Sequence, residues 1–154
     1  MKKVNVRHIA ITEVFESPCF DAICDEYREE CLRNPNLFGA KPDLAIYAKL
    51  EAAGLVRTVG AFCEDELVGM CVVLASSVPH FAGRVIASTE TLFVSKPYRA
   101  SKAGKMLISA AESIALEVGA SGLYITAPVG GRLESLMPHV GYSQTNTIFY
   151  RGLK

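Results

Sequence analysis

Four basic residues recur at every third position in residues 94–108, VSKPYRASKAGKMLI, where an apolar strand gives way to a helix. They are Lys96, Arg99, Lys102 and Lys105, with no acidic residue among them. Ser101 is a suitable helix N-cap, so the backbone N–H groups of residues 102–105 would be the unpaired first donors of the helix. Those donors and the helix dipole attract anions, and Gly104 would let a bulky anion approach the backbone. The stretch predicts a phosphate-binding site, with a solvated surface turn as the alternative.

Two common phosphate motifs are absent from this stretch. A Walker loop requires G-x-x-x-x-G-K-[ST], but Arg99 stands in place of the first glycine and Met106 in place of the hydroxyl residue. The dinucleotide fingerprint G-x-G-x-x-G is also missing. What remains is R-x-x-K-x-G, Arg99 to Gly104, after the strand end LFV (92–94) and the turn PYR (97–99).

This segment resembles the most diagnostic part of the GCN5-related N-acetyltransferases, the GNAT family. There, a strand ending in an apolar residue and valine, a Pro-Tyr-Arg-like turn and a [QR]-x-x-G-x-[GA] helix start bind the pyrophosphate of acetyl-coenzyme A (acetyl-CoA). Lys102 replaces the first family glycine, which either adds a charge to the phosphates or narrows the loop. ELVGM (66–70) and VGY (140–142) extend the likeness.

The resemblance implies acetyl-CoA as cosubstrate and a set of residues that bind it. The backbone amides of Phe93 and Val94 would pair with the pantetheine arm and polarise the thioester carbonyl. The helix start would hold the pyrophosphate through Arg99, Ala100, Ser101, Lys102, Ala103, Gly104 and Lys105. The implied activity is N-acetyl transfer to an amine of a small molecule or protein, by direct attack in a ternary complex.

Glu90 is the candidate catalytic base. An ammonium has no lone pair, so attack on the thioester requires loss of a proton from the acceptor. Glu90 lies four residues before Val94 in a strand that contains the apolar residues Ile86, Ala87, Leu92 and Phe93, and we expect burial there to raise its pKa. The resemblance implies the same role for a glutamate on this strand. The alternative is that Glu90 only pairs with a basic residue or with backbone amides.

The general acid has no clear candidate. The resemblance places a tyrosine four residues before the Gly-Phe pair, but Met137 occupies that position, and Gly130 lies near the place of a usual asparagine. Possible substitutes are Tyr142, Tyr150, Tyr124 and His139. These departures also fit a second hypothesis, a catalytically weak acyl-CoA-binding or protein-interaction module on the same fold.

Alternating and helical periodicities predict the elements that position these residues. Strands are expected at 4–14, 55–63, 67–76, 84–94, 122–127 and 145–153, with helices at 18–34, 42–54, 101–119 and 132–139. Strand 84–94 is apolar on both faces, so we expect it to be central in the sheet. With the next helix and the buried strand 122–127 it is expected to form a βαβ unit, in which the two strands are parallel. We expect a GNAT-like α/β fold with a mostly antiparallel mixed sheet, one parallel step and flanking helices.

Composition bounds the remaining expectations. The chain has 154 residues, half of them apolar, which fits one acetyltransferase-like domain over residues 1–154. Sixteen basic and sixteen acidic residues cancel, which argues against nucleic-acid and membrane partners, and the acids of residues 21–30 are interpreted as a solvated helix face.

Several smaller expectations follow from local patterns. No run is long enough to span a membrane and no signal peptide is evident, so a cytoplasmic protein is expected. Five cysteines lack metal-ligand spacing, which favours buried reduced thiols and no metal site. The aromatic and β-branched last strand suggests a homodimer. The acceptor amine is not specified by any strong charge signature.

Overall fold

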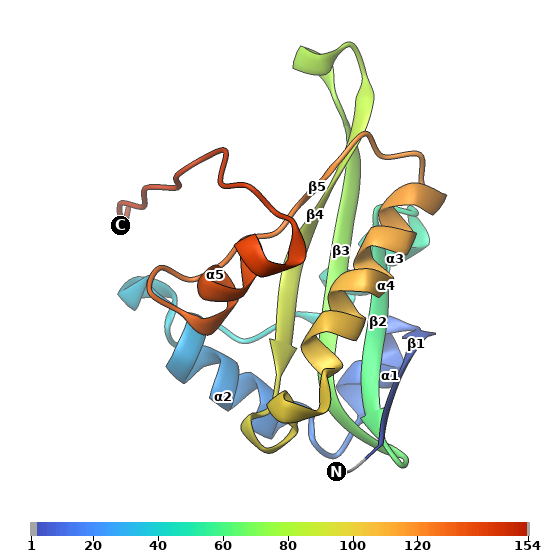
Figure 1. Cartoon of the computed structure of the whole chain (residues 1–154), viewed down its shortest axis with the longest axis vertical. Helices are drawn as coiled ribbons and strands as arrows, with labels where there is room; N and C mark the ends of the chain where they lie inside the picture. The colour runs from blue at the N-terminus through green and yellow to red at the C-terminus, as the bar shows by residue number, and fades with distance from the viewer. Residues whose placement is uncertain (1–2, 154) are drawn as a thin grey trace.

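The computed structural model describes residues 3–153, and its centre is one five-stranded sheet in the order β1-β2-β3-β4-β5 (Figure 1). The strands are β1 (Val4–Ile9), β2 (Val56–Cys63), β3 (Glu66–Val78), β4 (Arg84–Val94) and β5 (Leu123–Tyr124). The first three pairings are antiparallel and the pairing of β4 with β5 is parallel. The expected α/β fold with one parallel step is confirmed.

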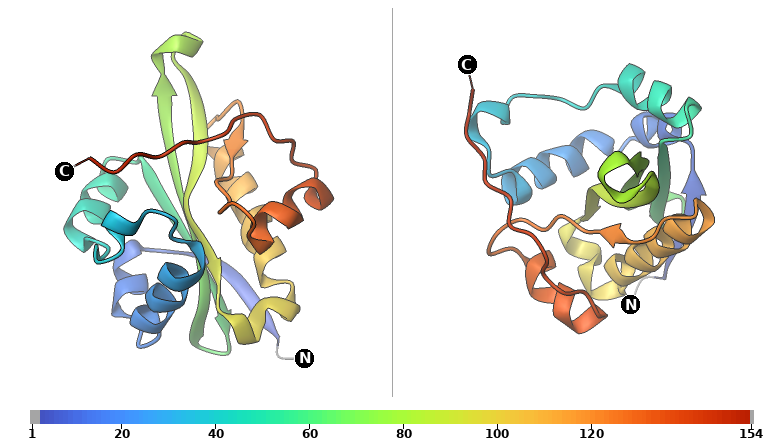
Figure 2. Two further views of the ribbon diagram at one scale, coloured as in Figure 1. Left: turned by 90° about the vertical axis from the view of Figure 1, so that its left-hand side faces the viewer. Right: turned by 90° about the horizontal axis from the view of Figure 1, so that it is seen from above.

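Helices cover both faces of the sheet (Figure 2, right). One face carries α1 (Ile11–Glu16), α2 (Phe20–Cys31) and α3 (Leu44–Ala52), and the other carries α4 (Ala103–Glu117). The short helix α5 (Arg132–Leu136) follows β5. Short 3-10 segments are η1 (Pro35–Leu37), η2 (Pro79–Phe81), η3 (Lys96–Ser101) and η4 (Met137–Val140). No helix within residues 3–153 is both long and apolar enough to cross a membrane.

The core forms two apolar layers, one on each side of the sheet. Leu107, Ala111 and Ile114 of α4 are completely buried against β2, β3 and β4, as the apolar stripe of that helix predicts. Ile11 and Ile23 anchor the opposite layer under α1 and α2. Burial of one such side chain stabilises the fold by about 1.5–3 kcal/mol, so α4 is fixed firmly against the sheet.

The predicted strand 4–14 is wrong beyond Ile9, because residues 11–16 form the helix α1. Ile11 and Val14, three positions apart, are both buried on the helix face that meets the sheet. The Ile11 N–H donates to Glu51 Oε1 at 3.0 Å, which fixes the start of α1 against α3. This tertiary contact overrides the strand preference of the β-branched residues.

The predicted buried strand 122–127 is also wrong in length and burial. β5 has only two residues, paired as Ala87 with Leu123 and Ser88 with Tyr124, and Tyr124 is 47% exposed. β4 therefore has a neighbour on both sides only near its middle, rather than along its whole length as a central strand would. Past Ser88 the pairing with β5 ends, which leaves the outer backbone edge of residues 90–94 without a strand beside it.

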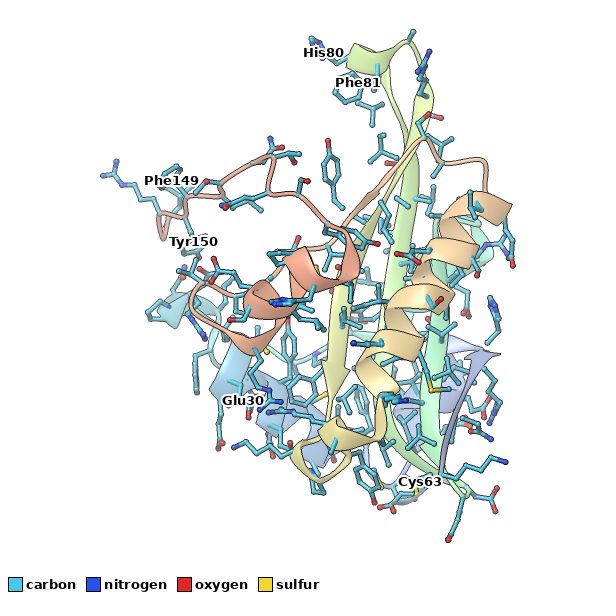
Figure 3. The ribbon with its side chains drawn as sticks, viewed as in Figure 1. Glu30, Cys63, His80, Phe81, Phe149 and Tyr150 are labelled. Atoms are coloured by element: carbon cyan, nitrogen blue, oxygen red, sulfur yellow. The ribbon has the colours of Figure 1, made fainter. Side chains whose placement is uncertain are left out.

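The predicted last strand, 145–153, has no strand structure. This segment runs extended across the molecule toward η1, where the Tyr150 hydroxyl donates to Asn36 Oδ1 (Figures 2 and 3). Ile148 and Phe149 are 75% and 91% exposed. β-branched and aromatic residues favour a strand only where another strand packs beside them, and none in residues 3–153 pairs with this segment.

Candidate active site

Glu90 lies at a break in the ladder between β3 and β4. Val72 pairs with Thr91 and Val73 pairs with Thr89, so Glu90 is an extra residue on β4 and forms a β-bulge. A bulge interrupts the alternation of side chains, and Glu90 and Thr91 consequently line the same pocket. The residue type and strand of Glu90 were predictable, whereas its direction depends on this bulge.

Two hydroxyl groups hold the Glu90 carboxylate. Tyr47 donates to Oε1 at 2.7 Å and Thr91 Oγ1 donates to Oε2 at 2.6 Å. The expectation of burial is wrong, because Glu90 is exposed on the side of the pocket. A carboxylate has about four acceptor sites, so both oxygens can accept a further hydrogen bond or a proton.

Tyr47 reaches Glu90 because α3 begins where the sequence predicts. The Asp43 side chain caps α3 by accepting the N–H groups of Ala45 (2.9 Å) and Ile46 (3.2 Å), a contact typically worth about 1 kcal/mol. Burial, followed by the charge of Glu90, raises the pKa of Tyr47. Tyr47 is therefore a neutral hydrogen-bond donor at physiological pH.

The pocket beside Glu90 has a volume of about 270 Å³ and is formed by α1, α2, α3, β3 and β4. Much of its wall comes from the apolar layer under α1 and α2, including Ile11, Phe20 and Met70. Cys24 also lines it, and burial raises the pKa of this thiol to about 11. The Cys24 thiol is therefore protonated at neutral pH, which makes it a poor nucleophile.

The basic junction after β4 differs from the expected cap. The 3-10 turn η3 includes Ser101, so α4 begins at Ala103 and its N-cap is Lys102, not Ser101. Ser101 Oγ donates to the Tyr98 carbonyl and lies 3.4 Å from the Ala103 N–H, which donates to it. The N-cap moved by one residue because the turn tightens before the helix starts.

The first turn of α4 keeps the geometry of an anion site. The first helical bond runs from the Met106 N–H to the Lys102 carbonyl at 3.1 Å, so the amides of Gly104 and Lys105 precede it and point out of the helix end. A Cβ atom on Gly104 would meet nothing within 4 Å, so internal packing does not require glycine there. Amides that precede the first helical hydrogen bond are groups that bind anions in many proteins.

Lys102 has a left-handed backbone, with φ 68° and ψ 5°. This conformation costs an L-residue roughly 1–2 kcal/mol, whereas glycine adopts it freely. The conformation gives a physical reason for glycine at this position. Lys102 keeps the turn and adds an exposed cation beside the helix end.

Arg99 is engaged within the protein. Its Nη1 and Nη2 atoms donate to Glu30 at 3.2 and 2.6 Å, and its Nε donates to the Val94 carbonyl at 2.9 Å. The guanidinium also lies over the Phe93 ring, 5.3 Å from its centroid. This bidentate pair fixes the junction to α2, and its hydrogen bonds lower the pKa of Glu30.

The acids of α2 are therefore not merely a solvated face. Lys96 Nζ lies 3.2 Å from Glu30 Oε1, and the Lys96 N–H donates to Glu26 Oε2 at 3.0 Å. Figure 3 shows Glu30 on α2 beside the turn after β4. Glu26 and Glu30 thus hold the loop that leads from β4 into α4.

Comparison with known proteins identifies the family. The model of the acetyltransferase (GNAT) family matches residues 20–131, which is more than half of the chain. The chain belongs to the GNAT family. A comparison with curated proteins found no match.

Solved structures share the GNAT fold over nearly their whole length. Ribosomal-protein-alanine N-acetyltransferase from Brucella melitensis biovar Abortus 2308 is 18% identical, with a TM-score of 0.73 over 98% of this chain and 99% of that one. An aminoglycoside acetyltransferase from an uncultured soil metagenomic sample, in complex with sisomicin, is 18% identical, with a TM-score of 0.76 over 98% and 97%. AAC(6')-Iy, in complex with the bisubstrate analog CoA-S-monomethyl-acetylneamine, is 18% identical, with a TM-score of 0.68 over 98% and 99%.

The two backbone amides implied by the GNAT resemblance point in different directions. A Cβ atom added to Gly69 would lie 2.7 Å from the Phe93 carbonyl oxygen. The Ser95 N–H donates to the Val68 carbonyl at 2.9 Å. The backbone groups of Phe93 and Ser95 therefore point toward β3. Successive residues of an antiparallel strand present their backbone groups to opposite edges. Val94 and Leu92 therefore face the open edge of β4. Sequence reasoning missed Leu92, which this alternation could have indicated.

Of the four candidates for a general acid in this GNAT chain, Tyr124 pairs with Ser88 on β4 and the other three contact residues elsewhere. Tyr142 donates to Glu112 Oε1 at 2.9 Å, and burial followed by this bond raises the pKa of Tyr142. His139 Nδ1 lies 3.0 Å from the Ser135 carbonyl, and Tyr150 contacts Asn36. None of the four candidates lines the Glu90 pocket, whose lining lies wholly within the described residues.

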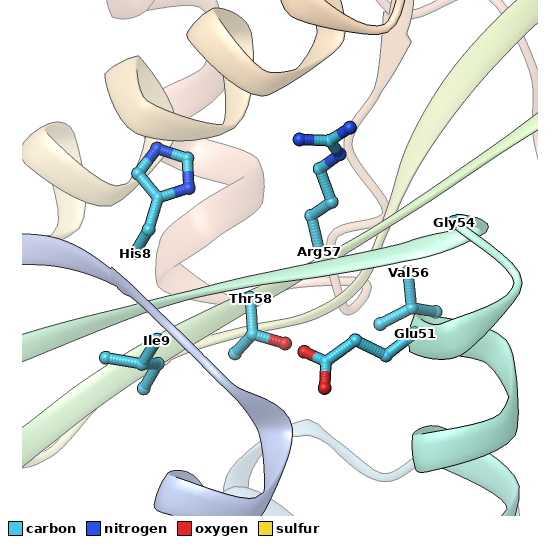
Figure 4. A pocket seen from close by; sticks show the side chains of 7 residues that line it. All are labelled: His8, Ile9, Glu51, Gly54, Val56, Arg57 and Thr58. Atoms are coloured by element: carbon cyan, nitrogen blue, oxygen red, sulfur yellow. The ribbon is translucent and has the colours of Figure 1, made fainter.

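A second cavity, also of about 270 Å³, lies beside β1 and β2 (Figure 4). It is lined by His8, Ile9, Glu51, Gly54, Val56, Arg57 and Thr58. Thr58 Oγ1 is buried without a hydrogen-bond partner, while the Glu51 carboxylate lies on the same side of β2. This cavity shares no lining residue with the Glu90 pocket and is separate from the GNAT site.

The cysteines and possible metal ligands add no further site. All five cysteines are free; Cys63 and Cys71 are buried and the other three are half-buried, so the expectation of burial is met only in part. Within residues 3–153, no group of three or more His, Cys, Asp and Glu side chains could hold a metal ion.

Proposed function

We propose that this chain transfers an acetyl group from acetyl-CoA to an amine, which attacks directly within a ternary complex. The observation that carries the proposal is the bulge in β4. It directs Glu90 into a pocket on one side, while the end of the same strand leads into the open first turn of α4. Acceptor and cosubstrate would thus meet along a single strand.

The cosubstrate would lie along the open edge of β4 and the start of α4. The backbone groups of Leu92 and the Val94 N–H face that edge and can pair with the pantetheine arm, whereas the Val94 carbonyl accepts from Arg99. The amides of Gly104 and Lys105 can hold the pyrophosphate, with exposed Lys102 and Lys105 supplying positive charge. Arg99 acts mainly by positioning this loop through Glu30, because three of its five N–H donors are already engaged within the protein.

The chemical step requires one base and a good leaving group. Glu90 accepts a proton from the acceptor ammonium, and the freed nitrogen lone pair attacks the thioester carbonyl carbon. The new C–N bond forms and the C–S bond breaks. The nitrogen then loses its second proton and the coenzyme A thiolate gains one. A thiol has a pKa of about 8.5, so this thiolate leaves without a strong acid.

Direct attack is supported by the state of Cys24. A covalent acetyl-enzyme would need a nucleophile in the pocket, and Cys24 is the only cysteine among the lining residues that the structure describes. Its thiol, with a pKa raised to about 11, is protonated at neutral pH. Cys24→Ser should therefore leave the rate of acetyl transfer nearly unchanged.

The first test replaces the base. Glu90→Gln should lower amine-dependent thiol release from acetyl-CoA by about 10²-fold or more, because the amide cannot accept the ammonium proton. Acetyl-CoA affinity, measured by calorimetric titration, should stay the same. Glu112→Gln is a matched control, since this carboxylate also accepts a tyrosine hydroxyl but lies outside the pocket. Equal rates for Glu90→Gln and the wild type would rule out Glu90 as the base.

A binding-only role on the same fold is the second candidate function. Its support is Met137 in place of the expected tyrosine, together with the engagement of Tyr142, Tyr150 and His139 by other residues. Such a protein would be stabilised by acetyl-CoA in a thermal-unfolding assay yet release no thiol with any amine. Release of thiol with even one acceptor would exclude this role.

A further inference from the structure

The acceptor pocket has an aromatic and apolar wall. The Phe15 ring centroid lies 4.4 Å from that of Phe20 and 5.9 Å from that of Tyr47. All three residues line the pocket, together with Met70 and Val72 from the sheet. Such a surface gains most from an acceptor whose body is itself apolar.

Charged side chains reach the pocket from three separate elements. Glu90 on β4 is the only acid among the lining residues, all of which the structure describes, whereas Arg28 on α2 and Lys41 before α3 are cations. Arg28 Nη1 lies 2.9 Å from Asp25 Oδ1, but Asp25 does not line the pocket. The guanidinium has five N–H donors, so its pairing with Asp25 leaves others for a ligand.

This charge pattern disfavours a polycationic acceptor. One ammonium group can lie beside Glu90, but every further ammonium group would meet Arg28 or Lys41 without a second carboxylate in the lining. An anionic group on the acceptor would instead complement those two cations, and the planar fork of arginine suits a carboxylate.

We propose that the acceptor is a small amine with an apolar body and one carboxylate, a hydrophobic amino acid, with its nitrogen at Glu90 and its carboxylate at Arg28 and Lys41. The inference rests on the acetyl transfer proposed above. The volume of about 270 Å³ agrees with a small acceptor, since pockets for drug-sized ligands span about 300–1,000 Å³.

The test compares two acids with their amides. Phenylalanine is compared with phenylalaninamide, and 4-(aminomethyl)benzoate with 4-(aminomethyl)benzamide, which places the amine and carboxylate at two different separations. At least one acid should exceed its amide by about tenfold in kcat/KM for thiol release, because it alone forms charge-assisted hydrogen bonds. The amine of phenylalaninamide is less basic than that of phenylalanine, so acceptor chemistry alone would favour the amide.

Two variants connect the preference to the pocket. The double variant Arg28→Gln/Lys41→Gln should lose the preference for the acid over its amide, mainly through a higher KM for the acid. Lys49→Gln is the matched control, because Lys49 is an exposed cation of α3 outside the pocket. A preference that survives the double variant would overturn the assignment.

The remaining outcomes separate this inference from the proposed function. Faster turnover of spermidine or sisomicin than of either acid, or no acid exceeding its amide, would overturn the inference while acetyl transfer stands. If no amine releases thiol, the proposed function fails. The preference of the pocket for a carboxylate is then tested by calorimetric titration of each acid and amide into the protein with coenzyme A. Tighter binding of an acid, lost in the double variant, would support it, and equal or absent binding would overturn it.

Discussion

At the scale of single residues, Lys102 combines two opposing effects. Its left-handed backbone is a strain that glycine would relieve, and its ammonium group is a charge that glycine would remove. The sequence leaves open whether Lys102 adds a charge for the phosphates or narrows the loop. The structure separates the two effects into a cost in folding free energy, from the strained backbone, and a gain in binding free energy, from the charge.

Substitution at Lys102 should separate them. Lys102→Gly should raise the free energy of unfolding by about 0.5–1 kcal/mol relative to Lys102→Ala, because glycine relieves the strain of about 1–2 kcal/mol but loses about 0.5–1 kcal/mol more conformational entropy on folding. Both variants should weaken acetyl-CoA binding severalfold at low salt, and the loss should shrink at high salt. Urea unfolding and calorimetric titration at two ionic strengths measure these effects. Equal stability of the two variants would contradict the strain.

At the scale of elements, the contact between α2 and η3 holds the start of α4, where we propose that the pyrophosphate binds. The Glu30 carboxylate accepts hydrogen bonds from both Nη atoms of Arg99, and its Oε1 lies 3.2 Å from Lys96 Nζ. One carboxylate therefore anchors the loop between β4 and α4. Without this anchor the first turn of α4 would keep its amides but lose its fixed position relative to β4.

The stability of this contact should depend on pH. Hydrogen bonds from Arg99 lower the folded-state pKa of Glu30 below its ordinary value of 4.5. The stabilisation is therefore fully present above pH 4.5 and is lost as pH falls through the folded pKa. Glu30→Gln should be less stable than the wild type at pH 7, with the difference shrinking in acid, as measured by urea unfolding between pH 3 and pH 7. Glu29→Gln, an exposed acid of the same helix, should show no such trend.

The elements that the sequence predicts correctly are those whose pattern reflects their own burial. The stripe of Leu107, Ala111 and Ile114 and the hairpin of β2 and β3 are of this kind. Two of the strand predictions that were wrong depend on partners far away in the sequence. The contact between the Ile11 N–H and Glu51 fixes the start of a helix where a strand was predicted. The described residues 145–153 have no neighbouring strand to pair with. Glu90 lies between these cases. The sequence shows a glutamate on this strand, but the direction of its side chain is set by the bulge in the pairing of β4 with β3.

At the scale of the whole molecule, exposed aromatic and apolar side chains are found, among other places, in two parts of the surface. The β3–β4 hairpin extends beyond the rest of the sheet and carries His80 and Phe81 at its tip (Figures 1 and 3). The other part is the C-terminal segment, where Ile148, Phe149 and Leu153 are 75%, 91% and 80% exposed. Apolar side chains gathered in this way are typical of contact surfaces between proteins.

The homodimer suggested by the sequence can be tested at this segment. Its strand-forming residues pair with no strand in the described chain, so a second copy would supply the missing neighbour. We expect the wild type to sediment as a dimer at micromolar concentration and Ile148→Ser/Phe149→Ser to sediment as a monomer with little loss of stability at the protomer level, because neither side chain is in the core. Leu116→Ser, at a 78% exposed position on α4, should remain dimeric. A monomeric wild type would refute the expectation, and a dimer unchanged in the double variant would place its interface elsewhere.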